Sequence, residues 1–143
     1  MLAVDLSLDQ LEDTMKYSAV HKDRIIPHQC DVTDVDQVEA MIEACVTRFG
    51  SLDVLVNNVG GSSKGGPVEL SAEDWQTQID YNLTSVFNTC KFALPQMAAK
   101  KCGSIVNIAS TSGLRWTGSA QVGYATSKAG VIQLSKVVAV EYA

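Results

Sequence analysis

Long apolar runs and clusters of positive charge are both missing from this sequence of 143 residues. A membrane-spanning helix needs about 20 consecutive apolar residues, and no stretch approaches that length. The net charge is −5 and Lys100-Lys101 is the only basic doublet, whereas nucleic-acid binding requires clustered Lys and Arg. We therefore expect neither a membrane nor a nucleic acid as a partner. No N-terminal targeting pattern is present, which favours a cytoplasmic location.

Metal-binding and phosphate-loop motifs are missing as well. The cysteines show no CxxC spacing and the histidines form no HExxH motif, so the sequence predicts no metal site. These residues are Cys30, Cys45, Cys90, Cys102, His21 and His28. We interpret the cysteines as buried or half-buried free thiols in a reducing compartment. The Gly-rich stretch 60–66 lacks the GxxxxGK[ST] pattern and is interpreted as a flexible turn.

The composition that remains is typical of one globular domain, with 46% hydrophobic and 19% charged residues. Short apolar runs alternate with stretches of helical periodicity. The predicted strands are 2–5, 24–28, 52–56 and 104–109, and the predicted helices are 8–17, 35–49, 71–100 and 122–143. Strands that alternate with helices pair in parallel and are covered by those helices. We predict an α/β fold with a doubly wound parallel sheet of the Rossmann type.

Local signals indicate several element boundaries. Asp34 and Gly50 are positioned to cap the two ends of the second helix. Ser71, followed by Asp74, begins the third helix in the manner of a capping box. Pro95 is expected to kink this third helix or to end its first part. The third predicted strand is continuously apolar, which predicts burial of both its faces.

Tyr124 and Lys128 are four residues apart in the last predicted helix. Residues at this spacing share a helix face, so the Lys128 ammonium is expected near the Tyr124 phenol. An unperturbed phenol has a pKa of about 10, and a nearby cation lowers the pKa of a phenol by favouring the phenolate. The pair therefore suits a general acid/base. Taken alone, the same spacing also occurs where a solvated lysine follows a helical tyrosine.

Polar residues follow two of the predicted strands. Ser110 ends the fourth strand, and Asn57-Asn58 end the third. Ligands of open α/β sheets bind at the carboxyl ends of strands, so Ser110 is placed to hydrogen-bond a substrate oxygen beside Tyr124. The two asparagines could tie neighbouring strands together and line a cofactor cleft, and Gly60 would let a backbone approach closely. In isolation, turn formation explains Ser110 and the asparagines about as well.

In this order and spacing, the residues resemble the signature of the classical short-chain dehydrogenase/reductase family. They are Asp31-Val32, Asn57-Asn58-Val59-Gly60, Asn82, Ser110, Tyr124 and Lys128. The resemblance covers essentially the whole chain, and Val59 replaces the alanine of the usual NNAG. It implies a partial NAD(P)-binding Rossmann domain over residues 1–143. It also implies an oxidoreductase that transfers hydride between NAD(H) and a small-molecule alcohol or carbonyl substrate.

The resemblance further implies roles for four catalytic residues. Tyr124 would be the acid/base. Lys128 would lower the pKa of the phenol and hold the nicotinamide ribose. Ser110 would orient the substrate oxygen, and Asn82 would bend the long helix and anchor a water of the proton relay.

A second group of residues is implied for the cofactor. Asp31 and Val32 would flank the adenine, and Asn58 would stabilise the central sheet beside the cofactor, close to Gly60. Asp5, at the end of the first strand, resembles the acidic residue that binds the adenosine ribose hydroxyls. A carboxylate there repels a 2′-phosphate, so NAD(H) is expected in preference to NADP(H).

Both ends of the family pattern are absent from the sequence. The family begins with a strand and a TGxxxGxG turn that holds the pyrophosphate, and no TGxxxGxG occurs here. The last strands of the family's sheet are absent too. Without the first strand, the sheet is expected either to fall into two pairs or to pair its flanking strands directly. We expect a truncated isoform, a fragment or an incomplete gene product of a longer dehydrogenase.

Two other hypotheses stay open. The chain could be an inactive module that docks onto full-length relatives, because the family's subunit interface commonly uses the helices that begin at Ser71 and carry Tyr124. The compatible apolar face, which core packing explains equally well, is Val131, Leu134, Val138 and Tyr142. The third hypothesis is a nucleotide-binding protein with other chemistry. A complete parent enzyme is expected to be a homo-oligomer, either a dimer or a tetramer.

Substrate specificity is expected mostly in the absent C-terminal segment and in the loop 114–122. Trp116 lies in this loop and is interpreted as an exposed or packed loop residue. Steroids, sugars, acyl thioesters and small alcohols all remain open as substrate classes.

Overall fold

The structure is a computed structural model that describes residues 1–17 and 22–143. Strands and helices alternate as the sequence predicts. In chain order, the elements are β1 (Leu2–Asp5), α1 (Leu8–Tyr17), η1 (Lys22–Arg24), β2 (Ile26–Gln29), α2 (Val35–Phe49), β3 (Val54–Asn57), α3 (Ala72–Ile79), η2 (Asp80–Thr84), α4 (Ser85–Ala99), β4 (Ser104–Asn107), η3 (Thr111–Gly113) and α5 (Val122–Glu141). Of the residues considered for a metal site, His21 lies outside the described residues. The fold is a partial α/β domain of Rossmann type.

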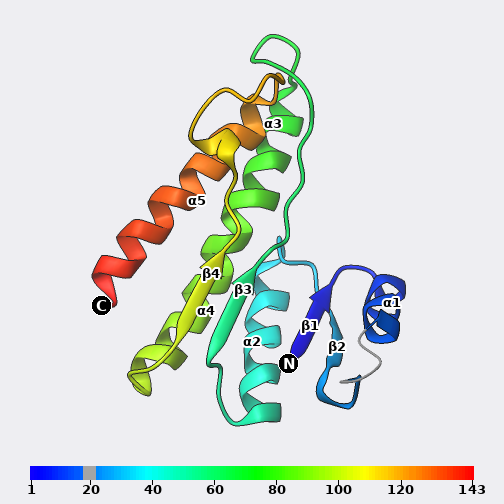
Figure 1. Cartoon of the computed structure of the whole chain (residues 1–143), viewed down its shortest axis with the longest axis vertical. Coiled ribbons are helices and arrows are strands. Elements are labelled where there is room, and N and C mark those ends of the chain that lie inside the picture. Colours follow the sequence, from blue (N-terminus) through cyan, green and yellow to red (C-terminus); the bar gives the residue numbers. More distant parts are fainter. Residues whose placement is uncertain (18–21) are drawn as a thin grey trace.

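The strands form two parallel pairs. β1 pairs with β2, with Asp5 beside Gln29, and β3 pairs with β4, with Asn57 beside Asn107. Figure 1 shows β1, β2 and α1 on one side of the molecule and β4 beyond β3 on the other. The first of the two sheet arrangements expected from the sequence is therefore confirmed.

Helices α2 and α4 supply the main apolar core behind β3. Val38 of α2 and Ala93 of α4 are both 0% exposed in this core, and Leu55 points into it from β3. Leu2 and Val4 of β1 pack against the same core. Burying an apolar side chain of this size contributes roughly 1.5–3 kcal/mol, so one core stabilises both strand pairs.

The opposite face of β3 and β4 is open to solvent, and the prediction that β3 is buried on both faces is wrong. Val54 and Val56 are each 57% exposed, and Val106 is 44% exposed. Alternate residues of a strand point to opposite faces, and Leu55 takes the covered face. Because α2 and α4 cover one face of this strand pair, the apolar residues that point the other way stay exposed.

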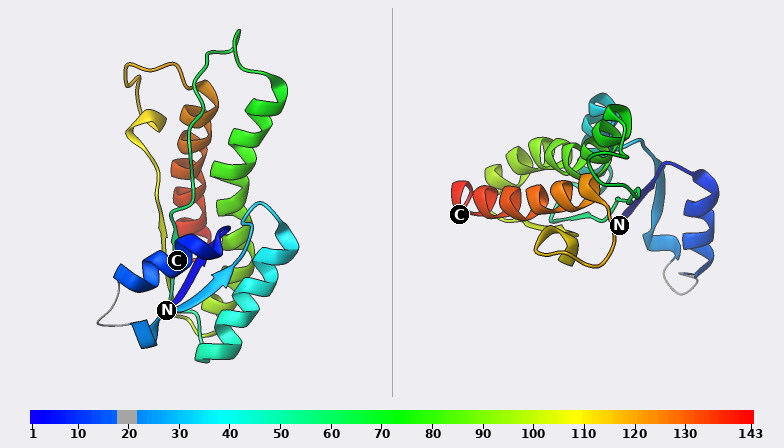
Figure 2. Two further views of the ribbon diagram at one scale, coloured as in Figure 1. Left: turned by 90° about the vertical axis from the view of Figure 1, so that its right-hand side faces the viewer. Right: turned by 90° about the horizontal axis from the view of Figure 1, so that it is seen from above.

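Helix α5 closes a second, smaller apolar cluster. Val86 and Cys90 of α4 pack there against Val131 of α5, with Leu134 at the edge. Figure 2 shows α5 running alongside α3 and α4, in agreement with the contacts of α5 with α3 and η2 and with the apolar cluster that it shares with α4. Core packing therefore accounts for Val131 and Leu134, two residues of the apolar α5 face that was considered for docking onto full-length relatives. Tyr142, at the end of that face, is 56% exposed.

All three helix caps expected from the sequence are present. The Asp34 carboxylate accepts backbone N–H groups from the first turn of α2, the nearest at 3.0 Å. Gly50 ends the same helix with a φ of 80°, a conformation that glycine adopts without steric cost. Ser71 Oγ accepts the N–H of Asp74 at 2.9 Å and begins α3.

The interruption of the long third helix lies at η2 and not at Pro95. Pro95 lies inside α4, which continues to Ala99, so the expectation that it ends the first part of the helix is wrong. η2 is a π-helical turn in which the Ser85 N–H donates to the carbonyl of Asp80, five residues back. Such a turn contains an extra residue and is frequent at functional sites.

A buried polar network joins β3, β4, α4 and α5. Asn57 Nδ2 donates to Asn107 Oδ1 at 2.8 Å, and Thr89 Oγ1 donates to Asn57 Oδ1 at 2.8 Å. Asn107 Nδ2 in turn donates to Ser135 Oγ at 2.9 Å. Asn57 therefore ties the strands together, as expected for one of the two asparagines, and the role expected for Asn58 stays a prediction. Asn58, the first residue beyond β3, is exposed.

Three of the four cysteines match the expectation of buried or half-buried thiols. Cys30 and Cys90 are buried, Cys45 is half-buried, and burial raises the pKa of all three thiols. Cys102 is exposed, so the expectation is wrong for this residue. It lies in the turn between α4 and β4, outside both apolar clusters.

We predict that Asn107→Ala lowers the free energy of unfolding by about 1–3 kcal/mol, because it leaves the buried Asn57 amide without its acceptor. Urea denaturation followed by circular dichroism measures this loss. Asn58→Ala is the matched control, and its exposed amide predicts a change within about 0.5 kcal/mol. Equal losses in the two variants would contradict the network.

Candidate active site

Tyr124 and Lys128 lie one turn apart in α5, as the sequence predicts. Lys128 Nζ is 5.7 Å from the centre of the Tyr124 ring. The Lys128 side chain is 3% exposed, and its Nζ donates to the carbonyl of Ile108, just beyond β4, at 2.7 Å. Tyr124 is half-buried. The first turns of α5 therefore hold a buried amine beside a phenol that is still partly accessible.

Burial lowers the pKa of the Lys128 ammonium below its ordinary value of 10.5, because desolvation disfavours the charged form. An ammonium has three donor hydrogens, and the bond to Ile108 uses one of them. The others can bind hydroxyl or carbonyl oxygens of a ligand.

Asn82 is the polar centre of the site and is 0% exposed. Its Oδ1 accepts the Gly61 N–H at 3.0 Å, and its Nδ2 donates to the Gly61 carbonyl at 2.9 Å. A Cβ on Gly60 would lie 2.9 Å from Asn82 Oδ1 and 3.1 Å from Lys128 Nζ. The absence of a side chain at Gly60 leaves room for the Asn82 and Lys128 side chains, which meet there, whereas the expected approach of a backbone stays a prediction.

Ser110 lies at the carboxyl end of the same strand pair. The Ile108 N–H donates to the Asn57 carbonyl at 2.9 Å, which carries the chain in register past the end of β4. Ser110 is half-buried, and its Oγ accepts the Ser112 N–H at 3.1 Å. The residue therefore caps η3, as the turn interpretation expects, and it also follows the carbonyl that binds Lys128.

Gly113 belongs to the site architecture but was not predicted. A Cβ there would lie 2.7 Å from the backbone of Lys128 and 2.7 Å from that of Ala129, so η3 packs directly on α5. A glycine within a Ser/Thr/Gly-rich loop carries no local sign of such a distant contact. The role of the Ile108 carbonyl could not be predicted from the sequence either, because every residue has a backbone carbonyl.

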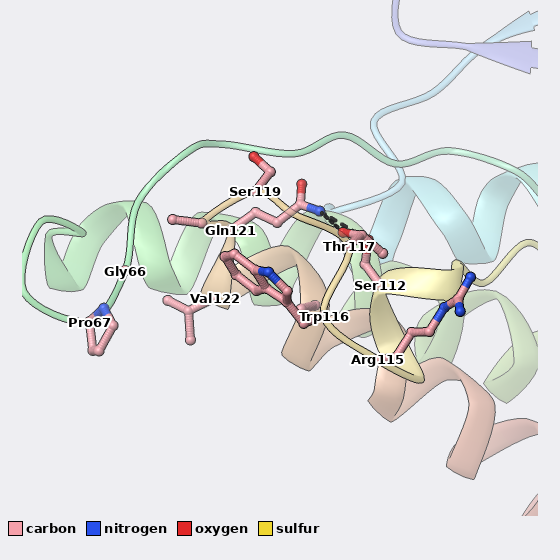
Figure 3. Close-up of a pocket in the computed structure, with 11 residues that line it drawn as sticks. Gly66, Pro67, Ser112, Arg115, Trp116, Thr117, Ser119, Gln121 and Val122 are labelled. Atoms are coloured by element: carbon pink, nitrogen blue, oxygen red, sulfur yellow. Dashed lines mark hydrogen bonds between the residues drawn. The ribbon is translucent and has the colours of Figure 1, made fainter.

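A pocket of about 360 Å³ opens between the loop 114–122 and the segment before α3. Its apolar walls are Pro67, Trp116, Val122 and Ala125. In Figure 3 the Gln121 amide points toward Thr117, and Gln121 Nε2 also donates to Ser112 Oγ at 2.9 Å. Trp116 is 73% exposed, which confirms an exposed loop residue, and it also lines the pocket.

Within residues 1–17 and 22–143, no group of three His, Cys, Asp or Glu side chains is placed to hold a metal ion. None of the helices in this part of the chain is long and apolar enough to cross a membrane.

The family model for short chain dehydrogenases matches residues 1–143. The chain belongs to the short-chain dehydrogenase family. A relative in this family is the 3-oxoacyl-[acyl-carrier-protein] reductase FabG of Thermotoga maritima. It is 37% identical over 143 residues, which make up 100% of this chain and 58% of that protein.

Solved structures of short-chain dehydrogenases share the fold. A putative short-chain dehydrogenase/reductase from Burkholderia xenovorans is 50% identical with a TM-score of 0.95, and the match covers 99% of this chain and 54% of that one. The F189W actinorhodin polyketide ketoreductase with NADPH is 35% identical with a TM-score of 0.92, over 99% of this chain and 54% of that one. This short-chain dehydrogenase chain therefore spans about half the length of its relatives.

The candidate cofactor residues of this short-chain dehydrogenase fall into two groups. Asp5 is the last residue of β1 and Asp31 follows β2, whereas Lys128 lies beside the ends of β3 and β4. Asp5 Oδ1 accepts the Ser7 N–H at 2.9 Å, and Asp31 Oδ1 accepts the backbone N–H of Thr33 at 2.9 Å. One oxygen of each carboxylate is thus engaged in a turn.

Val32, by contrast, is 8% exposed and belongs to the main core with α2. Its side chain packs inside the protein, so any contact with an adenine would come from its backbone.

We predict that Lys128→Met raises the free energy of unfolding near pH 7, because the variant removes a desolvated ammonium. The folded-state pKa of Lys128 is below the unfolded one, so the unfolded state binds more protons in the range just below 10.5. The free energy of unfolding of wild type therefore rises relative to that of the variant as the pH rises into that range. The advantage of Lys128→Met over wild type becomes smaller.

Denaturant titrations at several pH values between 7 and about 10 measure this difference. Lys136→Met, on the exposed side of the same helix, is the matched control and should show no comparable trend. A Lys128→Met variant less stable than wild type near pH 7 would count against a costly buried charge.

Proposed function

We propose that this chain carries the catalytic part of an oxidoreductase that transfers hydride between NAD(H) and an alcohol or carbonyl substrate. The observation that carries the proposal is that Asn82 and Lys128 meet at Gly60, with the Tyr124 ring centre 5.7 Å from Lys128 Nζ, at the carboxyl ends of β3 and β4. Open α/β sheets bind ligands at this end of their strands. Membership of the short-chain dehydrogenase family supports the reaction class.

Tyr124 is the general acid/base in this proposal. It gives its phenolic proton to the substrate oxygen when a carbonyl is reduced, and takes the proton back when an alcohol is oxidised. The Lys128 ammonium, with its Nζ 5.7 Å from the ring centre, favours the phenolate form by electrostatic attraction. The Ser110 hydroxyl donates to the same substrate oxygen and orients it.

The site fits a nicotinamide cofactor, which supplies or accepts the hydride when bound. Lys128 has donor hydrogens beyond the one bound to Ile108, and these suit the hydroxyls of a ribose. Gly60 and the exposed Asn58 offer backbone and amide groups beside it. Asn82 holds the Gly61 backbone in place and anchors a water that connects Lys128 to solvent.

The adenosine end of the cofactor is assigned to the β1–β2 pair. Asp5 binds the ribose hydroxyls through its carboxylate, while Asp31 and the Val32 backbone flank the adenine. A carboxylate at Asp5 disfavours a 2′-phosphate, so NAD(H) is proposed over NADP(H), in contrast to the NADPH of the actinorhodin ketoreductase structure.

The substrate is proposed to reach Tyr124 from the pocket beside α5. Val122 and Ala125 flank Tyr124 in sequence and line this pocket, and Trp116 offers an apolar wall. The oxoacyl reductase named among the relatives makes a 3-oxoacyl thioester a suitable probe. The whole protein is proposed to be a homo-oligomer, as is typical of the family.

Cofactor titration tests the proposal directly on the 143-residue chain. We expect saturable enhancement of NADH fluorescence and weaker binding of NADPH. Asp5→Asn should lower the affinity for NADH. It should also reduce the preference for NADH over NADPH by about 3- to 10-fold, because it removes the charge that repels a 2′-phosphate. Asp9→Asn, on the exposed face of α1, is the control. Failure of the wild-type chain to bind either cofactor would refute the proposal for this chain.

Tyr124→Phe tests the acid/base role. We expect it to reduce the rate of NADH oxidation with an acetoacetyl thioester by about 100-fold or more, while the NADH dissociation constant changes little. Tyr142→Phe, at the exposed end of α5, should leave the rate unchanged. A wild-type rate in Tyr124→Phe would remove Tyr124 from the mechanism.

A further inference from the structure

A buried glutamine, Gln78, lies where three segments of the site meet. It is the last but one residue of α3 and is 8% exposed. Its Oε1 accepts the backbone N–H of Ser63 at 3.2 Å and lies 3.4 Å from Asn82 Nδ2. Its own carbonyl accepts from the same Asn82 Nδ2 at 2.9 Å. One residue thus contacts both the loop after β3 and the carboxamide at the centre of the site.

The aliphatic part of Gln78 packs against the start of α5. A Cβ on Gly123 would lie 3.0 Å from Gln78 Cβ and 3.1 Å from Gln78 Cγ. Gly123 directly precedes Tyr124. The distance between α3 and the first turn of α5 is therefore set by direct contact between the Gln78 side chain and the α5 backbone.

The loop that Gln78 holds is anchored at every second residue. Gly61 is bound by Asn82, and Ser63 by Gln78. The Gly65 N–H donates to the Ala120 carbonyl at 2.9 Å. Gln78 supplies the middle anchor, between one at Asn82 and one just before α5.

We propose that Gln78 is a positioning residue for the Tyr124–Lys128 site. It fixes the loop 61–63 against Asn82 and, through Gly123, fixes the start of α5 that carries Tyr124. Its significance for catalysis rests on the proposed function, whereas its structural action does not. Gln78 touches neither Tyr124 nor Lys128 and acts through Asn82, Ser63 and Gly123.

Gln78→Met is the main variant, because Met keeps the length and packing of the side chain and removes the acceptor. Backbone amide exchange by NMR on the 143-residue chain is the first readout. We expect the Ser63 amide to exchange about 3- to 10-fold faster, the range that the net loss of one hydrogen bond gives. The second readout is the set of Tyr124 ring carbon resonances, with those of Tyr142 as an internal reference.

Gln76→Met is the matched control, since Gln76 is an exposed glutamine of the same helix. Ser63→Ala is the second control: the Ser63 hydroxyl is buried and has no hydrogen-bond partner among the described residues, and the backbone N–H remains. Neither control should change the exchange rate of the backbone amide at position 63 by more than about twofold.

Gly123→Ala disturbs the contact between Gln78 and α5 from the α5 side. It replaces Gln78→Met as the test variant if Gln78→Met fails to fold. Its added Cβ displaces Gln78, so we expect faster exchange of the Ser63 amide and shifted Tyr124 resonances here too.

The proposal is overturned if the folded variants leave the exchange rate of the Ser63 amide within twofold of the controls, or shift the Tyr124 resonances no more than those of Tyr142. Cofactor affinity is measured in parallel. A wild-type chain that binds no cofactor would defeat the proposed function, while the exchange and resonance data still decide the role of Gln78.

Discussion

The pair of hydrogen bonds between the Asn82 carboxamide and the Gly61 backbone is the constraint on which the site depends. One fully buried side chain satisfies both polar groups of a loop residue, and an unpaired buried group would cost about 1–3 kcal/mol. The π-helical turn at η2 contains Asn82, so the extra residue of that turn helps to set where the side chain points. The close approach at Gly60 and the place of Lys128 follow from this arrangement.

A buried amine and a buried carboxamide are both costly in a small domain, and the polar network between β3 and β4 offsets part of the cost. A two-stranded parallel pair has few backbone hydrogen bonds of its own. The Asn57–Asn107 bond adds a side-chain connection at the last register position, where the site begins. Thr89 and Ser135 extend it to α4 and α5. The carboxyl end of the strand pair, where the candidate site lies, is thus connected through side chains to both α4 and α5.

Signals that act within a few residues were predictable from the sequence. The caps at Asp34, Gly50 and Ser71 and the spacing of Tyr124 and Lys128 depend on one helix each, and all are present. The alternation of side chains along a strand is also local, but which face of β3 is covered depends on the distant helices α2 and α4.

The same limit explains the other corrections. A proline tolerated within a helix and an apolar strand with one open face both reflect packing partners that the local sequence does not specify. Ser110 was located by its place after β4, whereas Gln78 and Gly113 gained their roles from contacts 15 residues or more away.

The open face of β3 and β4 affects how this chain is best studied. Val54, Val56 and Val106 form a patch of aliphatic side chains that faces water in the folded state. Fluorescent dyes that report molten or misfolded states do so by binding such surface. The native chain will therefore bind such a dye before any unfolding begins, so dye-based melting curves will start from a high signal.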